Sequence, residues 1–205
     1  PPLDYYKNKM LHFFSPGAGA AAAALDAGPD GAPLEDVERD VALGCLLYRW
    51  ELLLPEQRAG EDPSPAVREL AARGLADLER AGAVQVADGR ARVRDAERAR
   101  LLRDQLRSYH EVYYAALLTA RRRWRGELEG DSMRGARAEH ARLEEAGAIR
   151  KPEGLTRINL RTAFGALKDL RLSRPASGEH PFAAGAVGDR LIGFVRRALE
   201  ISKGN

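Results

Sequence analysis

The apolar spacing changes between residues 65 and 93 from a period typical of helix to one typical of strand. Over residues 65–81, apolar side chains recur every three or four positions, as on one face of a helix. Two short β-prone runs, 83–86 and 90–93, then flank Asp88-Gly89, a dipeptide that favours a tight hairpin turn. The stretch predicts helices packed around very little sheet.

The rest of the chain has mostly helical patterning, and Ala, Leu, Arg and Glu dominate its composition. A stripe of apolar residues predicts that the longest helix runs from Ala96 to about Arg125. Further helices are expected over residues 34–54, 132–146, 155–170 and 182–201. The predicted fold class is therefore mainly α, a helical bundle with one small β-hairpin.

The first residues predict a separate amphipathic helix. Over residues 3–16, apolar and aromatic side chains fall on one helical face, and prolines mark both boundaries. Residues 17–25, GAGAAAAAL, are expected to fray into a linker over residues 26–33, because glycines and prolines follow the alanines. We therefore predict a connecting helix in residues 1–25 and a helical domain over residues 34–205.

Composition excludes several classes of function. The 33 basic and 30 acidic side chains leave a net charge of +3, too small to indicate a nucleic-acid or membrane partner by itself. The single cysteine, Cys45, lies in an apolar run, which indicates a buried and inert thiol. The sequence has no metal-ligand spacing, no glycine-rich phosphate loop and no apolar run long enough to cross a bilayer. No metal and no cofactor is expected.

The strongest family resemblance lies in the first helix. Tyr-Tyr-Lys-Asn followed by Leu-His-Phe-Phe resembles a segment of the glycerol-3-phosphate and dihydroxyacetone-phosphate acyltransferases that lies just after their acyltransferase domain. The matching residues, whose role the resemblance leaves open, are Tyr6, Lys7, Asn8, Leu11 and His12. The resemblance implies that this chain is the C-terminal helical region of such an enzyme and that a catalytic domain precedes it.

The resemblance also implies a function for the whole protein. Members of the family transfer a fatty acyl group from acyl-CoA or acyl carrier protein to glycerol 3-phosphate in phospholipid synthesis. On this interpretation the partners are the chain's own upstream acyltransferase domain, the acyl donor through the full-length protein, and an anionic membrane surface. The expected location is peripheral, on the cytoplasmic face of a membrane.

The catalytic motif of that family is absent from this chain. The family uses a histidine and an aspartate separated by four residues, with the histidine as general base. None of the four histidines has an aspartate at that spacing, and the nearest pair is His140 with Glu145. These two lie about 140° apart on one charged helix, so a solvent-facing helix surface is the simpler interpretation. We therefore assign no catalytic residue.

A second apparent motif is the step Pro152-Glu153-Gly154, which is similar to the family's phosphate-binding step but carries Leu155 before Thr156 and Arg157. It follows Ile149-Arg150-Lys151 rather than a buried strand, so we interpret it as a turn that opens a helix.

One local charge cluster stands out, at the end of the longest predicted helix: Arg121, Arg122, Arg123, Trp124 and Arg125. Four guanidinium groups beside an indole are suited to bind phosphates or anionic lipid headgroups. Cations at a helix C-terminus also complement the helix dipole while remaining in solvent. Both interpretations are open from the sequence.

The alternative function is a winged-helix-like module that binds nucleic acid or protein. Its support is the helix over residues 65–81 with the following hairpin, where Arg90, Arg92 and Arg94 would be the cations of the wing. Glu69, Asp77 and Glu79 on that helix weaken phosphate contact, so no nucleic-acid partner is expected. A purely structural helical domain is the third possibility.

Overall fold

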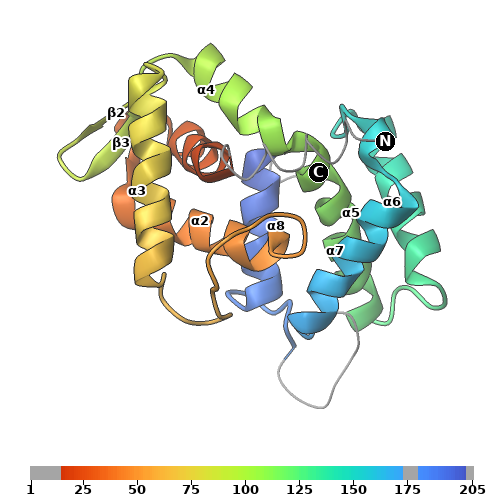
Figure 1. Cartoon of the computed structure of the whole chain (residues 1–205). Coiled ribbons are helices and arrows are strands. Elements are labelled where there is room, and N and C mark those ends of the chain that lie inside the picture. The colour runs from red at the N-terminus through yellow and green to blue at the C-terminus, as the bar shows by residue number, and fades with distance from the viewer. Residues whose placement is uncertain (1–14, 173–179, 202–205) are drawn as a thin grey trace. The chain divides into compact units, whose positions relative to one another are not determined.

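The computed structural model describes residues 15–172 and 180–201, and it divides the chain into two compact units. Unit 1 is Pro1–Leu106 and unit 2 is Arg107–Asn205. Both are built mainly from helices, and the described strands all belong to unit 1 (Figure 1). The predicted fold class, mainly α with a small hairpin, is confirmed.

Unit 1 has the order of elements of a winged helix. A helix over residues 15–26 and a short 3-10 turn, η1 (Gly28–Asp30), are followed by β1 (Ala32–Pro33). The remaining elements are α2 (Leu34–Tyr48), α3 (Pro65–Arg80), β2 (Val84–Ala87), β3 (Arg90–Val93), α4 (Ala96–Arg103) and the 3-10 turn η2 (Asp104–Leu106). The strands form an antiparallel sheet in the order β1-β3-β2.

The predicted hairpin is present at Asp88-Gly89. Val84 pairs with Val93 and Ala87 with Arg90, which leaves a two-residue turn. Asp88 and Gly89 have φ of 52° and 69°, as a type I′ turn requires. The third strand, β1, was not predicted, because its two residues lie in the stretch interpreted as linker. It pairs Ala32 with Ala91, closing the small sheet beside the hairpin.

The expectation that residues 17–25 fray was wrong. Residues 15–26 are helical, and five of the alanines, Ala18, Ala20, Ala21, Ala22 and Ala24, are at most 2% exposed. Gly74 of α3 faces this helix so closely that an added Cβ would lie 2.6 Å from the carbonyl carbon of Pro16. Small side chains on both helices permit this approach, so the alanine run is a core helix.

Unit 2 is organised around α5 (Arg107–Trp124), which packs against α6 (Ser132–Glu145), α7 (Arg157–Asp169) and α8 (Val187–Ala198). Most of α5 is buried, including every residue from Tyr109 to Ala120. Asp131 caps α6 by accepting the Met133 N–H, and Thr156 caps α7 by accepting the Asn159 N–H. Between these helices lies the 3-10 turn η3 (Pro152–Gly154).

Three predicted helices are shorter than expected. The last, expected over residues 182–201, spans Val187–Ala198. The helix expected from Ala96 to Arg125 is interrupted by η2, where Asp104 accepts a hydrogen bond from Arg103 Nε at 2.8 Å. The helix expected over residues 34–54 ends at Tyr48, whose carbonyl accepts the N–H groups of Glu51 and Leu52 in a turn. The division into a connecting helix and one helical domain stays a prediction.

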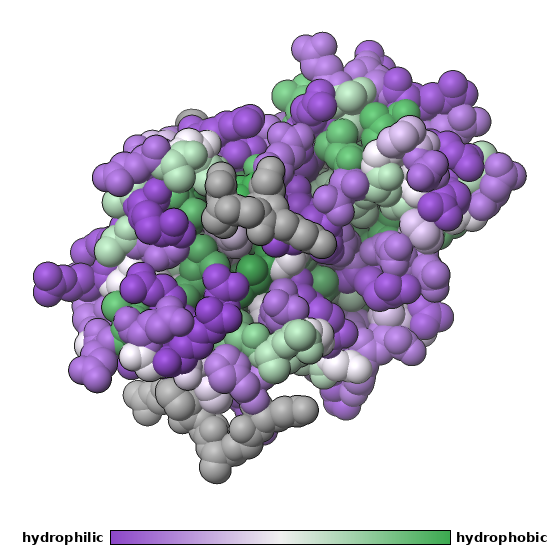
Figure 2. Space-filling model, turned by 180° about the vertical axis from the view of Figure 1, so that it is seen from behind, coloured by the Kyte–Doolittle hydropathy of each residue, from purple (hydrophilic) through white to green (hydrophobic). Residues whose placement is uncertain are grey.

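The face of the molecule drawn in Figure 2 is largely polar. Hydrophilic residues cover most of the face in Figure 2, with hydrophobic ones between them. Among the described residues no helix is both long enough and apolar enough to pass through a bilayer.

Candidate functional site

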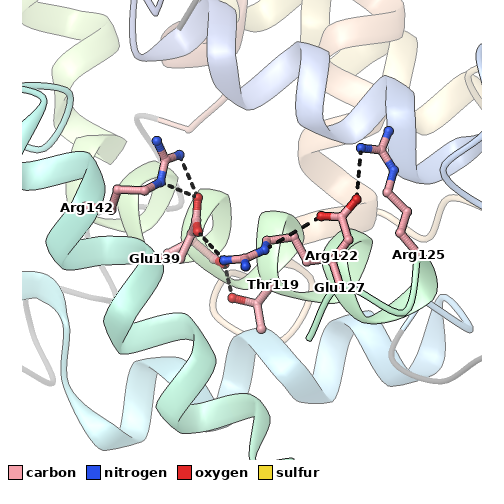
Figure 3. Close-up of polar contacts among 7 residues, drawn as sticks. Thr119, Arg122, Arg125, Glu127, Glu139 and Arg142 are labelled. Atoms are coloured by element: carbon pink, nitrogen blue, oxygen red, sulfur yellow. Dashed lines mark hydrogen bonds and ion pairs between the residues drawn. The ribbon is translucent and has the colours of Figure 1, made fainter. Parts of the chain in front are cut away.

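The arginine cluster lies at the C-terminal end of α5, where its members join an alternating chain of ion pairs (Figure 3). Arg142 Nη2 lies 2.7 Å from Glu139 Oε1, and Arg122 Nη1 lies 3.4 Å from the other oxygen of that carboxylate. Arg122 Nε and Arg125 Nη1 then reach Glu127, at 3.8 and 3.7 Å. Three arginines thus share two carboxylates, and two of the five predicted contact residues are neutralised within the chain.

Two more members of the cluster fasten the end of α5. Arg123 donates a hydrogen bond to Ser132 Oγ, at the start of α6. Trp124 Nε1 donates to the carbonyl of Leu172 at 2.8 Å, and its ring packs against His180 with centroids 5.5 Å apart. The indole therefore packs within unit 2. Contact of the whole cluster with an anionic surface stays a prediction.

The fifth member, Arg121, has a different environment. Its Nε is buried and has no hydrogen-bond partner among the described residues. Its charge acts on the Tyr114 phenol, as do those of Arg142 and Arg196. Burial raises the pKa of the Tyr114 phenol, against the opposing influence of the three guanidinium groups. Arg196 belongs to α8, so its electrostatic influence on Tyr114 has no signal in the local sequence.

A buried ion pair fastens the beginning of α5. Arg107 Nε lies 2.9 Å from Glu111 Oε1, and the two side chains are 3% and 0% exposed. Glu111 also accepts the backbone N–H groups of Arg150 and Lys151, at 2.8 and 2.9 Å. These contacts fix the chain just before η3. The predicted turn is present as η3, and the helix that follows it, α7, begins at Arg157. No local sequence pattern indicates that Glu111 holds the chain before this turn.

The described histidines lie in packed or hydrogen-bonded surroundings. His140 was expected on a solvent-facing surface, which is wrong: it is 2% exposed, because that side of α6 packs into unit 2. Burial lowers its pKa, opposed by the charges of Glu111 and Glu144. His110 is also buried and packs edge-on against Phe194. His180 accepts the Phe182 N–H through Nδ1, at 3.1 Å.

The winged-helix surface of unit 1 is not basic. On α3, Arg68 approaches Glu38 and Arg80 approaches Asp77. In the wing, Arg90 Nε donates to the carbonyls of Asp30 and Gly31, and Arg92 approaches Asp88. Each of these cations meets a partner inside unit 1, while Arg94 is exposed. This pattern opposes recognition of a phosphate backbone, which needs uncompensated cations.

The other sequence predictions concern the family-motif residues, Cys45 and metal binding. Tyr6, Lys7, Asn8, Leu11 and His12 lie outside the described residues. Cys45 is buried, as predicted, and burial raises the pKa of its thiol to about 12, so the thiolate is scarce at neutral pH. Within residues 15–172 and 180–201, no group of three or more histidine, cysteine or acidic side chains is placed to hold a metal ion.

Comparison with protein families gives one match. The model described as the glycerol-3-phosphate acyltransferase C-terminal region covers residues 1–176, which include all of unit 1 and most of unit 2. No curated protein and no solved structure matches the chain.

Proposed function

The chain belongs to the family of glycerol-3-phosphate acyltransferase C-terminal regions, and we propose that it is a non-catalytic part of its enzyme. The reaction of the whole enzyme is acyl transfer from acyl-CoA or acyl carrier protein to glycerol 3-phosphate, in phospholipid synthesis. The family match supports membership in such an enzyme. The environment of the ionisable groups supports the non-catalytic role.

The main support for this proposal is that the histidines that could act as bases are buried or already hydrogen-bonded to the backbone. A general base must reach the hydroxyl whose proton it removes. His110 and His140 are buried at 1% and 2% exposure, and His180 uses Nδ1 as an acceptor for a backbone N–H. In a histidine–carboxylate dyad that nitrogen would carry the proton donated to the acid. No described histidine therefore has both the access and the orientation that acyl transfer requires.

The proposed role is to support the acyltransferase domain through protein contacts. Unit 1 offers a winged-helix arrangement whose exposed helix α3 carries three arginines and three acids, so its surface is nearly neutral. Such a surface suits a protein partner better than nucleic acid. We propose the chain's own upstream acyltransferase domain as that partner. A peripheral place on the cytoplasmic face of a membrane belongs to the same proposal, and would follow from the whole enzyme's lipid product.

The test uses the full-length enzyme with His110, His140 and His180 each replaced by Gln. Removal of a general base lowers kcat by about 10²–10⁴-fold, whereas a packing residue changes stability and leaves the chemical step alone. We expect kcat within about twofold of the parent at a temperature where each variant is folded. A fall of about a hundredfold in any variant whose Tm is unchanged would contradict the non-catalytic role.

The winged-helix alternative is tested separately. Electrophoretic mobility shift with duplex DNA and RNA, at low salt, should show no shifted band for this chain. A shifted band whose affinity falls when Arg94 is replaced by Gln would favour nucleic-acid binding, since the described structure pairs the other wing arginines internally.

A further inference from the structure

The outward face of α7 carries a row of cations. This helix packs against α5 and α6 within unit 2 (Figure 1). Its buried positions are Leu160, Ala163, Ala166 and Leu167. The opposite face holds three exposed cations, Arg157, Arg161 and Lys168. Spacings of four and seven residues place these three within about 40° of one another around the helix axis, so they form one row along about 16 Å of helix.

No acid offsets these cations, unlike exposed arginines elsewhere in the chain. Arg39, Arg80 and Arg142 each form an ion pair with a carboxylate three or four residues away on the same helix. The sequence has no acid at those distances from Arg161 or Lys168. In the part of the chain that the structure describes, none of the three cations of α7 has an ion pair or a side-chain hydrogen bond. The row is therefore uncompensated positive charge.

The position of Arg157 is unfavourable for the helix itself. Arg157 is the first residue of α7, whose first turn contains no acid. The helix dipole favours anions at this end, so a cation here does not support the helix. Just before it, Arg150 and Lys151 are also exposed, and Glu111 fixes their backbone by accepting both N–H groups. Residues 150–169 hold five cations and two acids, an excess as large as the net charge of +3 of the whole chain.

An exposed isoleucine lies beside the row. Ile158 is 75% exposed, although burial of a branched apolar side chain is favourable. Gly165 follows it by seven residues and so lies on the same flank of the helix. An added Cβ at this glycine would meet nothing within 4 Å, so the flank is open there. One surface thus offers an apolar side chain and three cations to the same partner.

A membrane that contains anionic lipids matches both kinds of group. Its headgroups supply phosphate oxygens for the cations, and the acyl region just below them accepts an apolar side chain. An acidic protein surface would match the cations alone, because the apolar centre of a protein interface is depleted of charged residues. The side-by-side placement of Ile158 and the cations therefore favours a lipid surface.

We propose that Arg157, Arg161 and Lys168 bind the headgroups of an anionic membrane surface, with Ile158 inserted among the lipids. This inference rests on the proposed function, since it names the surface through which a peripheral enzyme would meet its membrane. It places that contact on α7 instead of residues 121–125, where the sequence suggested it.

The experiment measures cosedimentation of the full chain with vesicles of phosphatidylcholine alone and of equal parts phosphatidylcholine and phosphatidylglycerol. We expect binding to the anionic vesicles only, and a fall in affinity as salt is raised. Each basic residue near an anionic surface strengthens binding about fivefold. Arg157→Gln/Arg161→Gln should therefore lower affinity about 25-fold. Ile158→Ser should lower it about fivefold to tenfold through lost apolar burial, with the salt dependence unchanged.

A matched control removes the same charge from another helix of unit 2. Arg134 and Arg137 are exposed on α6 and have no ion pair among the described residues. Arg134→Gln/Arg137→Gln should leave affinity within about twofold, because only diffuse electrostatics changes. Circular dichroism checks that each variant is folded. If the double variant of α7 does not fold, Lys168→Gln alone should weaken binding about fivefold.

Binding to neutral and anionic vesicles alike, or to neither, would overturn the proposal. So would equal losses in the two double variants, or full affinity of Ile158→Ser. Binding to soluble polyglutamate but not to vesicles, lost in the double variant of α7, would assign the face to an acidic protein instead.

Failure of this inference is distinguishable from failure of the proposed function. Anionic vesicle binding that survives every change on α7 would overturn the assignment to this helix and leave a peripheral location standing. The non-catalytic role is decided by the kcat of the histidine variants, which vesicle binding does not measure.

Discussion

The two units differ in the kinds of side chain that are buried around their central helices. In unit 1 the central cluster contains small and aliphatic side chains, and the alanine helix over residues 15–26 passes α3 at a glycine. In unit 2 the central helix α5 buries ionisable groups, including Arg107, His110 and Glu111. Surface ion pairs such as Arg80 with Asp77 in unit 1 contribute little to stability, whereas a buried pair is strongly destabilising to break.

The contrast shows where each unit is sensitive. In unit 1 the backbone at Pro16 lies so close to Gly74 that a larger side chain at this glycine is expected to destabilise the unit. In unit 2 an ion pair is buried, so removing one of its two charges is expected to destabilise the unit. The chain has two tryptophans, Trp50 in unit 1 and Trp124 in unit 2, so each unit can be followed separately in a background where the other tryptophan is replaced by Phe.

The largest expected effect is on unit 2, from Glu111→Gln. The change leaves Arg107 buried without its counter-charge and weakens the acceptor for the Arg150 and Lys151 N–H groups. We expect a loss of about 3–5 kcal/mol in the free energy of unfolding of this unit. Urea denaturation followed by Trp124 fluorescence measures it.

The matched control for that change is Asp77→Asn in unit 1. Its pair with Arg80 has a similar length, 2.9 Å, but the side chains are 76% and 56% exposed. We expect a loss of less than about 1 kcal/mol. Comparable losses for the two substitutions would remove the distinction between buried and exposed charge on which the comparison rests.

A smaller effect is expected in unit 1, from Gly74→Ala. Alanine favours helix over glycine by about 1 kcal/mol, but here its Cβ would collide with the backbone of Pro16. We expect a net loss of about 1–3 kcal/mol, typical of overpacking. Gly165→Ala in α7 is the control, since an added Cβ there meets nothing within 4 Å. Stabilisation by both substitutions would show that the helix over residues 15–26 does not pack so closely.

The smallest expected effect is a pH dependence from Glu51, which follows α2. Burial raises the pKa of its carboxyl from 4.5 to about 7. Between these values the folded chain keeps a proton that the unfolded chain has lost, so this contribution to stability falls as pH rises through the window and is lost above about 7. Allowing for solvent screening, Glu51→Gln should gain about 1–2 kcal/mol relative to the parent between pH 5 and pH 8.

Thermal unfolding followed by Trp50 fluorescence at both pH values measures that gain. Glu56→Gln, an exposed position in the same loop, serves as the control and should track the parent at each pH. A stability difference between Glu51→Gln and the parent that does not change with pH would assign Glu51 to solvent.

Local chemistry made much of the fold predictable. Asp88-Gly89 supplies the positive φ angles of the hairpin, and Ser64 with Pro65 marks the start of α3, where the serine accepts the Val67 N–H. The alanine run was misread because alanine and glycine have no amphipathic contrast to reveal a buried face. The break at Asp104 was missed because the apolar stripe continues across it.

The candidate site was less predictable, since its residues meet only through tertiary packing. The sequence singled out Arg121 but grouped it with four neighbours that have other partners in the structure. Tyr114 lies seven residues before it, a spacing that places both on one helical face. Arg196 comes from α8, about 80 residues farther along, and no local pattern indicates that its charge acts on the same phenol.

An assay of the purified chain alone decides whether this region supplies a catalytic base. The measurement follows acyl transfer from acyl-CoA to glycerol 3-phosphate, with a heat-inactivated sample as blank and the full-length enzyme as positive control. We expect a rate equal to that of the blank, because His110 and His140 are buried and His180 accepts a backbone N–H. Turnover above the blank that disappears in His140→Gln, with the fold retained, would contradict it.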